Sequence, residues 1–431
     1  MTTDITKQDN PGDGAAQPQP AAQGAVAAVD PRLLVRQEGL KGYLHEFGRK
    51  LRSGDLGSLP VIVGLAVIWA VFQWQDDAFL SPKNLSDLSI LIVGTGLISV
   101  GIVFVLLLGE IDLSVGSLSG LAAAIVAVLS VNHGMPEGLA VLIALATGAA
   151  LGALHGVFFA KIGVPAFVVT LAGLLAWEGL KQQVLGTTGT ISLDEDGFVA
   201  SLTSHYFNQV IAAYGAAGVA VAGFFLAQLL DARRRKAAGI PFRPMADILV
   251  RTGALAVLAF AAAWKLNEYL GLPLALVIFV VVLVFFDFVL RRTSYGRKVF
   301  ALGGNIEAAR RAGINVDLVR ISVFALSGLM AACGGLIIAS RITSASQTAG
   351  TGTLLMEAIA AAVIGGTSLF GGRGNVWSAL LGMLVIGSIA SGMSLLGIAA
   401  SVQNMITGGV LLAAVVIDSV SRRTQRSAGR G

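Results

Sequence analysis

Runs of apolar residues, each close to the length of a membrane-spanning helix, constrain this chain more than any other feature. A helix needs about twenty apolar residues to cross the hydrocarbon core of a bilayer. Twelve such segments are predicted here, and two of them, 113–131 and 355–369, contain small and polar residues that fit either full or broken spans. The predicted fold is therefore an all-α polytopic membrane protein with about ten to twelve transmembrane helices. The other predicted segments are 59–72, 88–108, 139–160, 166–184, 210–230, 248–264, 274–290, 321–340, 376–396 and 402–417.

The composition supports a bilayer as the main partner of the chain. Charged residues make up 13% of the sequence, whereas soluble domains contain about a quarter. A net charge of +5 is compatible with nucleic-acid binding, but the basic residues lie in short loops between apolar runs. This distribution follows the positive-inside rule of membrane proteins, so we expect no nucleic-acid partner.

The same charges predict how the chain is oriented. Basic residues cluster before the first apolar segment, in two long loops and after the last segment, whereas acidic residues at Asp76 and Asp194 fall in loops on the other side. Both termini are therefore predicted to be cytoplasmic. The predicted regions are a disordered cytoplasmic tail (1–55), a first transmembrane half (56–185), an insertion with extra membrane segments (186–290), a cytoplasmic coupling loop (291–320), a second transmembrane half (321–420) and a basic cytoplasmic tail (421–431).

Short stretches of the two halves resemble each other. Val115-Gly-Ser-Leu118, followed by an Ala-rich run, resembles Thr351-Gly-Thr-Leu354, also followed by an Ala-rich run. The predicted topology makes the matched segments run in opposite directions. An inverted repeat of this kind places a transport path between the two halves. Chance similarity between helices rich in Ala and Gly is the alternative.

Two carboxylates between apolar segments make 109–117 the most unusual stretch. A charge at membrane depth costs several kcal/mol unless it is paired or lines water. Asp112 is a suitable cap for the next helix. Glu110 and Asp112 are thus compatible with a helix break beside a substrate path or with a juxtamembrane helix end and its cap. Other polar residues inside apolar segments are His155, which fits an interhelical hydrogen bond or a ligand, Glu357 and Asn404. The candidate substrate-pathway residues are Glu110, Asp112, Ser114, His155, Glu357 and Asn404.

A short helix is predicted in the second basic loop. Asn305 is a suitable N-cap, Glu307 falls in the first turn, Arg310 falls near the end and Gly313 is a suitable left-handed terminator. Such a helix is either a docking element for a soluble partner or a solvated connector. The candidate coupling residues are Gly304, Asn305, Glu307, Ala308, Ala309, Arg310, Arg311 and Gly313.

The sequence contains no pattern typical of an enzyme. The phosphate-loop pattern GxxxxGK[ST] does not occur, so the chain has no ATP site that the sequence reveals. The Gly-rich stretch 365–374 is predicted to form a tight turn. No metal-ligand cluster and no pairing of a nucleophile with a base is visible either, and we expect no cofactor and no metal.

Four stretches resemble one family closely. The stretches 109–117, 163–173, 295–316 and 357–375 resemble the permease subunits of binding-protein-dependent sugar ABC importers, the ribose, galactoside and xylose group. Extra length between 186 and 272 is similar to the insertion of the xylose-type members. Ribose-type members usually have Gly where Glu110 stands and Asn where His155 stands.

The resemblance implies a function and a set of partners. The chain would move a monosaccharide, D-xylose for a xylose-type member, across the bacterial inner membrane with ATP hydrolysed by a separate subunit. It would work as a homodimer with two cytoplasmic ATP-binding subunits and a periplasmic sugar-binding protein. The fold would be of the cobalamin-importer type, and the short helix from Asn305 to Gly313 would be the coupling helix. The alternative is an ion-coupled secondary transporter acting alone, with Glu110, Asp112 and Glu357 as ion sites.

Overall fold

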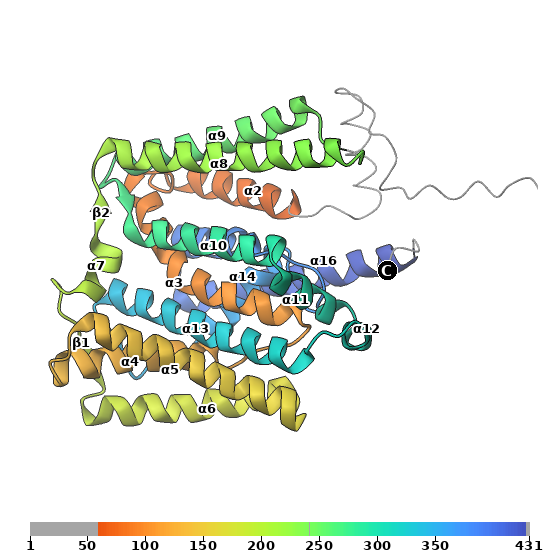
Figure 1. Ribbon diagram of the computed structural model, residues 1–431. Coiled ribbons are helices and arrows are strands. Elements are labelled where there is room, and N and C mark those ends of the chain that lie inside the picture. Colours follow the sequence, from red (N-terminus) through yellow and green to blue (C-terminus); the bar gives the residue numbers. More distant parts are fainter. Residues whose placement is uncertain (1–58, 241, 428–431) are drawn as a thin grey trace, which may run out of the picture.

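The computed structural model describes residues 59–240 and 242–427 (Figure 1). The predicted tail 1–55 and the last four residues of the basic tail 421–431 lie outside the described residues. The long helices are α2 (Leu59–Gln75), α3 (Pro82–Leu107), α4 (Val115–Ala127), α5 (Glu137–Val157), α6 (Ala166–Leu185), α8 (Val210–Ala237), α9 (Met245–Asn267), α10 (Leu274–Arg292), α13 (Val316–Ile342), α15 (Trp377–Leu395) and α16 (Ala400–Ser427). The shorter helices are α7 (Phe198–Ser204), α11 (Ser294–Gly304), α12 (Ile306–Arg311) and α14 (Leu354–Ile364), with π turns η1 (Val128–Asn132) and η2 (Phe158–Ile162) and a 3₁₀ turn η3 (Gly186–Thr188).

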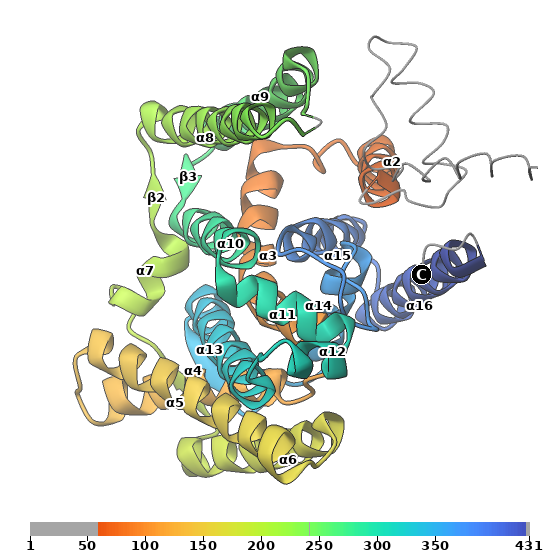
Figure 2. The ribbon, with the colours of Figure 1, turned by 45° about the vertical axis from the view of Figure 1, so that its right-hand side comes forward.

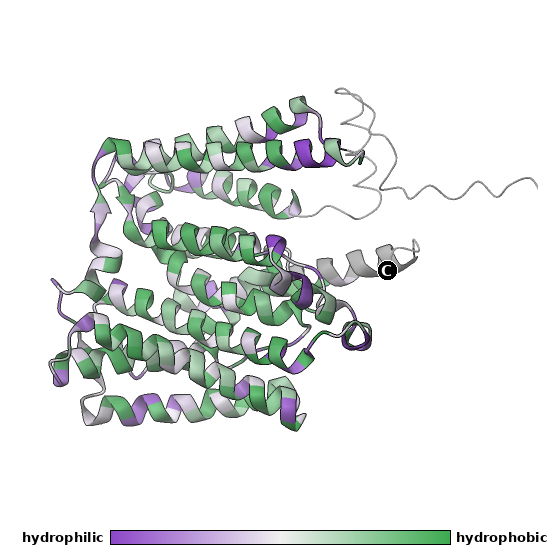
Figure 3. Ribbon diagram, in the orientation of Figure 1, coloured by the Kyte–Doolittle hydropathy of each residue, from purple (hydrophilic) through white to green (hydrophobic). Residues whose placement is uncertain are grey.

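Eight of the described helices are long and apolar enough to cross a membrane. They include α3, α5, α8 and α13, each with at least 26 residues when adjoining π turns are counted. Their hydrophobic residues cover the length of the bundle, and the hydrophilic ones gather toward its ends (Figure 3). The prediction of an all-α polytopic membrane protein is confirmed, and a helix occupies each of the twelve predicted segments.

The core of the bundle is built around α3 and α13. Nearly all of α3 from Ile92 to Leu107 is buried, and α13 packs against α3, α4 and α5. Glycines permit these close crossings: a side chain at Gly152 of α5 would overlap the Phe324 carbonyl of α13. Small residues at helix crossings let backbones approach closely, which is how helices associate where lipid removes the hydrophobic driving force.

The two ends of the bundle are distinct (Figures 1 and 2). At one end, called here the α12 end, the chain forms α11 and α12 between α10 and α13. At the opposite end, called the α7 end, α7 lies among two short antiparallel strand pairs. The strands are β1 (Thr190–Ser192) with β4 (Ser344–Ser346), and β2 (Tyr206–Phe207) with β3 (Leu272–Pro273).

Two helices, α4 and α14, begin inside the bundle rather than at an end. α14 has only 11 residues and leads to the turn 365–374 at the α12 end, so at about 1.5 Å per residue it starts about halfway through the bundle. α4 runs the other way, toward the α7 end, after the non-helical segment 108–114 has turned back from the α12 end. Their starts meet, because a side chain at Gly116 would contact Gly350 and Leu355. Two of the predicted repeat segments therefore begin inside the bundle and run in opposite directions.

The hairpin of α8 and α9 stands apart from the rest of the bundle (Figure 2). These two helices pack mainly against each other, and few of their residues are buried. α10 behaves differently: Phe279 and Leu283 are fully buried, and the Phe279 ring occupies the space over Gly96 of α3. The boundaries of the predicted insertion 186–290 stay a prediction, but α10 packs as part of the core.

Removing the α8–α9 hairpin is expected to leave the rest of the chain able to insert. Phe207 and Leu272 are register partners in the β2–β3 pair, so an Asn-Gly turn in place of residues 208–271 would close a short hairpin. Because two antiparallel spans leave together, every remaining span keeps its direction. Membrane insertion should match that of the full chain, measured as the amount of protein in the detergent-extracted membrane fraction.

A deletion of α8 alone is the matched control. Removing residues 210–237 leaves an odd number of spans, so the helices that follow it must reverse their direction. This variant is expected to be lost from the membrane fraction. Equal loss of both variants would contradict the prediction and show that the hairpin belongs to the core.

Candidate functional site

A buried carboxylate lies where α4 begins. Asp112 is 1% exposed, and both of its oxygens are hydrogen-bonded. Oδ1 accepts from the Ser114 hydroxyl at 2.6 Å and from the Ser114 backbone N–H at 3.0 Å. Oδ2 accepts from the hydroxyl of Ser327 on α13 at 2.7 Å. Three donors therefore hold the Asp112 carboxylate between the segment 108–114 and α13.

The hydrogen bonds continue from Ser114 to α5 and α6. The Trp177 indole N–H of α6 donates to His155 Nε2 at 2.9 Å, and His155 Nδ1 lies 3.3 Å from Ser114 Oγ. Because Nε2 accepts a hydrogen bond, a neutral imidazole carries its proton on Nδ1 and donates it to Ser114. Ser114 in turn donates to Asp112. Each hydrogen bond in this chain therefore donates in the direction from Trp177 to Asp112. The chain requires a neutral His155, because both ring nitrogens of a protonated imidazole are donors and neither can accept from Trp177.

The predicted capping role of Asp112 is wrong in its geometry. α4 begins at Val115 with Ser114 as its N-cap residue, and no side chain caps it. The Asp112 carboxylate instead accepts a hydrogen bond from the N–H of Ser114, two residues later in the chain. This bond closes a turn that precedes the helix. The carboxylate stabilises the end of the re-entering segment and links it to α13, rather than stabilising free N–H groups of α4.

Glu110 lies apart from this cluster, toward the α12 end. The neighbouring Gly109 has a left-handed φ of 79° and approaches the Phe370 backbone. Glu110 is half-buried, and burial raises the pKa of its carboxyl group, while Arg320 opposes that shift. Glu110 and Asp112 therefore have different surroundings, although only one residue separates them.

The two remaining pathway candidates lie on other helices. Glu357 is half-buried in the first turn of α14, where the Thr353 hydroxyl donates to its Oε1 at 2.7 Å. Asn404 is exposed on α16 beside the exposed Met405. Of the six predicted pathway residues, the structure brings Asp112, Ser114 and His155 together, and it leaves Glu110, Glu357 and Asn404 apart. The three acids of the ion-site alternative are thus not gathered in one place.

Sequence reasoning missed three residues that the structure places in buried polar contacts. Ser327 looks like an ordinary small residue in a spanning helix, and nothing in its neighbourhood gave a signal. Trp177 was missed because it lies within a span, not at its end. Lys181, with Glu178 one turn before it, did carry a signal: two opposite charges three residues apart inside the apolar segment 166–184.

The predicted short helix is present at the α12 end as α12. The Asn305 side chain accepts from the Ala308 N–H at 2.9 Å, and Gly313 ends the helix with a left-handed φ of 77°. Within this segment Ala309 is buried, whereas Ile306 and Ala312 are exposed. The exposed Glu307 and Arg310 form an ion pair of 3.2 Å. Gly304, Ala308 and Arg311, the other predicted coupling residues, are exposed as well.

Close backbone contacts connect this end of the chain to the core. A side chain at Gly303, the last but one residue of α11, would overlap the Leu107 carbonyl at the end of α3. The Gly372 N–H donates to the same carbonyl at 2.9 Å. These contacts connect α11 to the end of α3 and to the turn that follows α14.

The fold and these sites define a polytopic helical membrane protein with two helices that begin inside the bundle and an exposed, capped helix at one end. Comparison with known sequences shows to which family of membrane proteins the chain belongs. The chain belongs to the family described as the permease component of branched-chain amino acid transport systems, whose model matches residues 84–415. It is therefore a multi-pass inner-membrane permease subunit rather than an enzyme.

Relatives match over most of the chain. The xylose transport system permease protein XylH of Escherichia coli K12 is 36% identical over 374 residues, which cover 86% of this chain and 94% of the relative. XylH of Haemophilus influenzae is 37% identical over 376 residues, covering 87% and 99%. The ribose import permease protein RbsC of Bacillus subtilis is 31% identical over 366 residues, covering 85% and 94%. No solved structure matches the chain, so the cobalamin-importer type of fold stays a prediction.

Proposed function

We propose that this chain is the membrane-spanning subunit of an ATP-driven importer that carries D-xylose. The observation that carries the proposal is the identity of 36–37% with xylose permeases over nearly their full length, against 31–32% with ribose permeases. The permease works with ATP-binding and substrate-binding partners. The finer arrangement proposed is a homodimer of permeases with two cytoplasmic ATP-binding subunits and a periplasmic sugar-binding protein.

In this proposal the α12 end faces the cytoplasm, as do both termini. Basic residues support this orientation, because Arg233, Arg234 and Lys236 end α8, and Arg291 and Arg292 end α10, on that side. The α12 helix then receives the movement of the ATP-binding subunit, and the Gly303–Leu107 contact passes it on. The chain contributes no ATP site of its own.

Five of the six candidate residues take two roles along the proposed sugar path. Asp112, Ser114 and His155 are buried and fully engaged with protein donors and acceptors, so they fix the wall of the path rather than touch sugar. Glu357 and Asn404 have accessible side chains and are the candidates for contact with sugar hydroxyl groups. Glu110 lies at the α12 end, where a path would open to the cytoplasm.

Reconstitution tests the substrate. The chain is placed in liposomes with its ATP-binding subunit inside and its sugar-binding protein outside, and uptake of labelled sugar is measured with and without internal ATP. ATP-dependent uptake of D-xylose in excess over D-ribose supports the proposal. Uptake driven by an ion gradient without the ATP-binding subunit would favour the secondary transporter instead.

Reversing the charges of α12 is expected to uncouple the importer. The change Glu307→Arg with Arg310→Glu keeps an ion pair but places it against the helix dipole and inverts the surface that a partner meets. Xylose-stimulated ATP hydrolysis should fall by about tenfold or more, while the amount of permease in the membrane stays the same.

The matched control reverses an exposed ion pair on another helix at the same end. Asp231 and Arg235 on α8 are joined at 3.1 Å, and their side chains are 40% and 54% exposed. Asp231→Arg with Arg235→Glu should leave ATP hydrolysis unchanged, because surface pairs contribute little. Equal hydrolysis in both double variants would show that α12 is not the docking element.

A further inference from the structure

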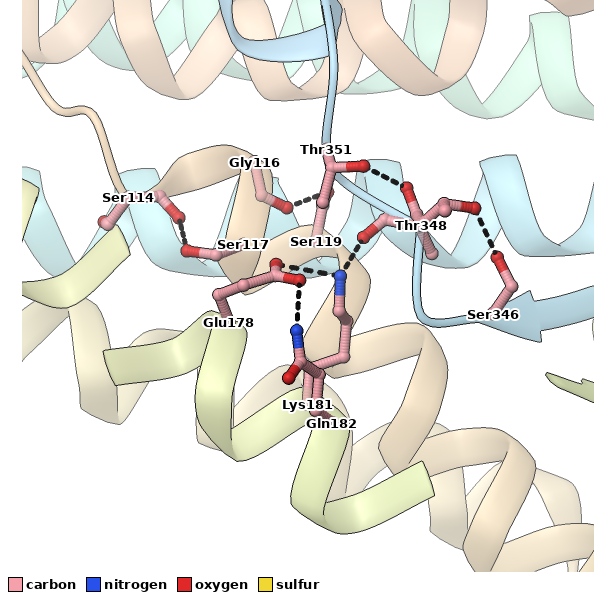
Figure 4. A network of polar contacts seen from close by, with 11 residues as sticks. Ser114, Gly116, Ser117, Ser119, Glu178, Lys181, Gln182, Ser346, Thr348 and Thr351 are labelled. Atoms are coloured by element: carbon pink, nitrogen blue, oxygen red, sulfur yellow. Dashed lines mark hydrogen bonds and ion pairs between the residues drawn. The ribbon is translucent and has the colours of Figure 1, made fainter. Parts of the chain in front are cut away.

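A lysine buried in α6 holds a segment that comes from the other half of the chain. The Lys181 side chain is 0% exposed, and its Nζ donates to the Ala349 carbonyl at 2.7 Å. The same Nζ forms an ion pair of 2.8 Å with Glu178, whose side chain is 24% exposed. Figure 4 shows the amine pointing out of α6 toward the segment that carries Thr348 and Thr351.

The segment held by Lys181 is the one that starts the half-helix α14. Residues 347–353 leave β4 at the α7 end and pass into the bundle to Leu354. Near the α7 end, this segment is fixed by Gln347, whose N–H donates to the Gly189 carbonyl at 2.9 Å, and by the β1–β4 pair. Deeper in the bundle, the segment lies close against α4. A side chain at Gly116 would meet the Gly350 backbone, and one at Gly120 would meet the Ala349 backbone.

A lysine amine is a stronger and more costly hydrogen-bond donor than the single carbonyl group of Ala349 requires. A non-helical segment at membrane depth leaves backbone carbonyls without helical partners, and hydroxyl groups or water can satisfy them. Burying a cation costs far more free energy than burying a hydroxyl group or a water molecule, and a buried cation persists only when it is paired. The bond from Lys181 to the Ala349 carbonyl is also charge-assisted, and such bonds are about twice as strong as neutral ones.

We propose that Lys181 is a positioning residue that ties the first half of the permease to the start of α14 and so holds α14 in register with α4 during transport. Its partner Glu178 pairs with the amine and holds it in the direction of Ala349. The proposal rests on the transport function proposed above. It assigns no contact with sugar to Lys181, which acts through the position of α14 and of Glu357 on it.

The decisive variant removes both charges together. Lys181→Met alone leaves Glu178 without its cation and risks failed insertion. Lys181→Met with Glu178→Gln removes both charges together, so that no uncompensated buried charge is left. Lys181→Arg keeps both the charge and a donor. The matched control is Lys161→Met, which changes an exposed lysine of η2.

The first measurement is ATP-driven uptake by the complete complex in liposomes. The double variant should lose about tenfold in uptake, the order that positioning residues contribute to coupling. Lys181→Arg and Lys161→Met should stay within about threefold of the unsubstituted complex. Normal uptake by the double variant would overturn the proposal, because Lys181 would then serve only to neutralise Glu178.

The second measurement reports the position of α14 directly. Spin labels at Leu175→Cys on α6 and Met356→Cys on α14 occupy exposed sites, in a chain whose single cysteine is changed by Cys333→Ser. The distance distribution between the labels should broaden at least twofold in the double variant and stay unchanged with Lys161→Met. An unchanged distribution in the double variant overturns the proposal whatever the uptake. Absence of uptake by the unsubstituted complex would instead count against the transport function, while the distances still report on Lys181.

Discussion

Asp112→Ala is expected to destabilise the permease strongly and to abolish uptake, whereas Asp112→Asn is expected to preserve both the stability and the uptake. Alanine leaves three buried donors, the Ser114 N–H and hydroxyl and the Ser327 hydroxyl, without their acceptor. Each buried donor left unsatisfied costs about 1–3 kcal/mol. Asparagine retains Oδ1 for Ser114, and the Ser327 hydroxyl can rotate to accept from the new amide group.

Melting temperature in detergent and sugar uptake in liposomes, measured together on both variants, check this prediction. Asp87→Ala is the matched control, because it removes a carboxylate from an exposed pair with Lys83 on α3, where the expected loss is below about 1 kcal/mol. An Asp112→Asn variant that melts normally but does not transport would contradict the expectation. It would show that the negative charge itself serves transport.

Gly152→Ala is expected to have the other large effect, a loss of the packing between α5 and α13. The added methyl group would overlap the Phe324 carbonyl and crowd the Gly328 N–H, which are backbone atoms and cannot move aside as a flexible side chain can. The two helices must separate, and the cost should reach about 3 kcal/mol, the upper end for overpacking. The measurement is the yield of monodisperse protein from the membrane together with its melting temperature.

Gly179→Ala provides the same chemical change without the clash. Gly179 lies on α6, and a side chain there would meet nothing within 4 Å. Alanine is a better helix former than glycine by about 1 kcal/mol, so this variant should be as stable as the unsubstituted chain or slightly more stable. Similar losses in both variants would mean that helix flexibility, rather than the crossing of α5 with α13, determines the effect.

Helix-forming segments were predictable because they depend on local composition. An apolar run such as 274–290 must satisfy its own backbone in lipid, and a helix is the way to do so with one segment. The short α12 helix was predictable for the same reason, since Asn305 and Gly313 act on neighbouring backbone groups. The two doubtful spans were also indicated by their small and polar residues: α4 and α14 both begin inside the bundle, and α14 has only 11 residues.

Pairing between distant side chains was not predictable. Asp112 and Ser327 are 215 positions apart, and Lys181 and Ala349 are 168 apart, so no local pattern connects them. The capping role expected of Asp112 failed because the sequence showed the next helix but not where α13 would pass. Lys181 was visible as a charge inside a span, yet its partner is a backbone carbonyl, which every residue has.

The sequence by itself determined the class of protein, the positions of its membrane segments, the capped helix at one end and, through its resemblance to known permeases, its family. These properties follow from hydrophobic length, local capping and charge, each of which acts over about twenty residues or fewer. Tertiary structure alone decided which polar residues meet. It brought Asp112, Ser114, His155 and Trp177 into one chain of hydrogen bonds and placed Lys181 on the start of α14. The physical reason is that buried polar groups in a membrane protein take their partners from whichever helix packs beside them.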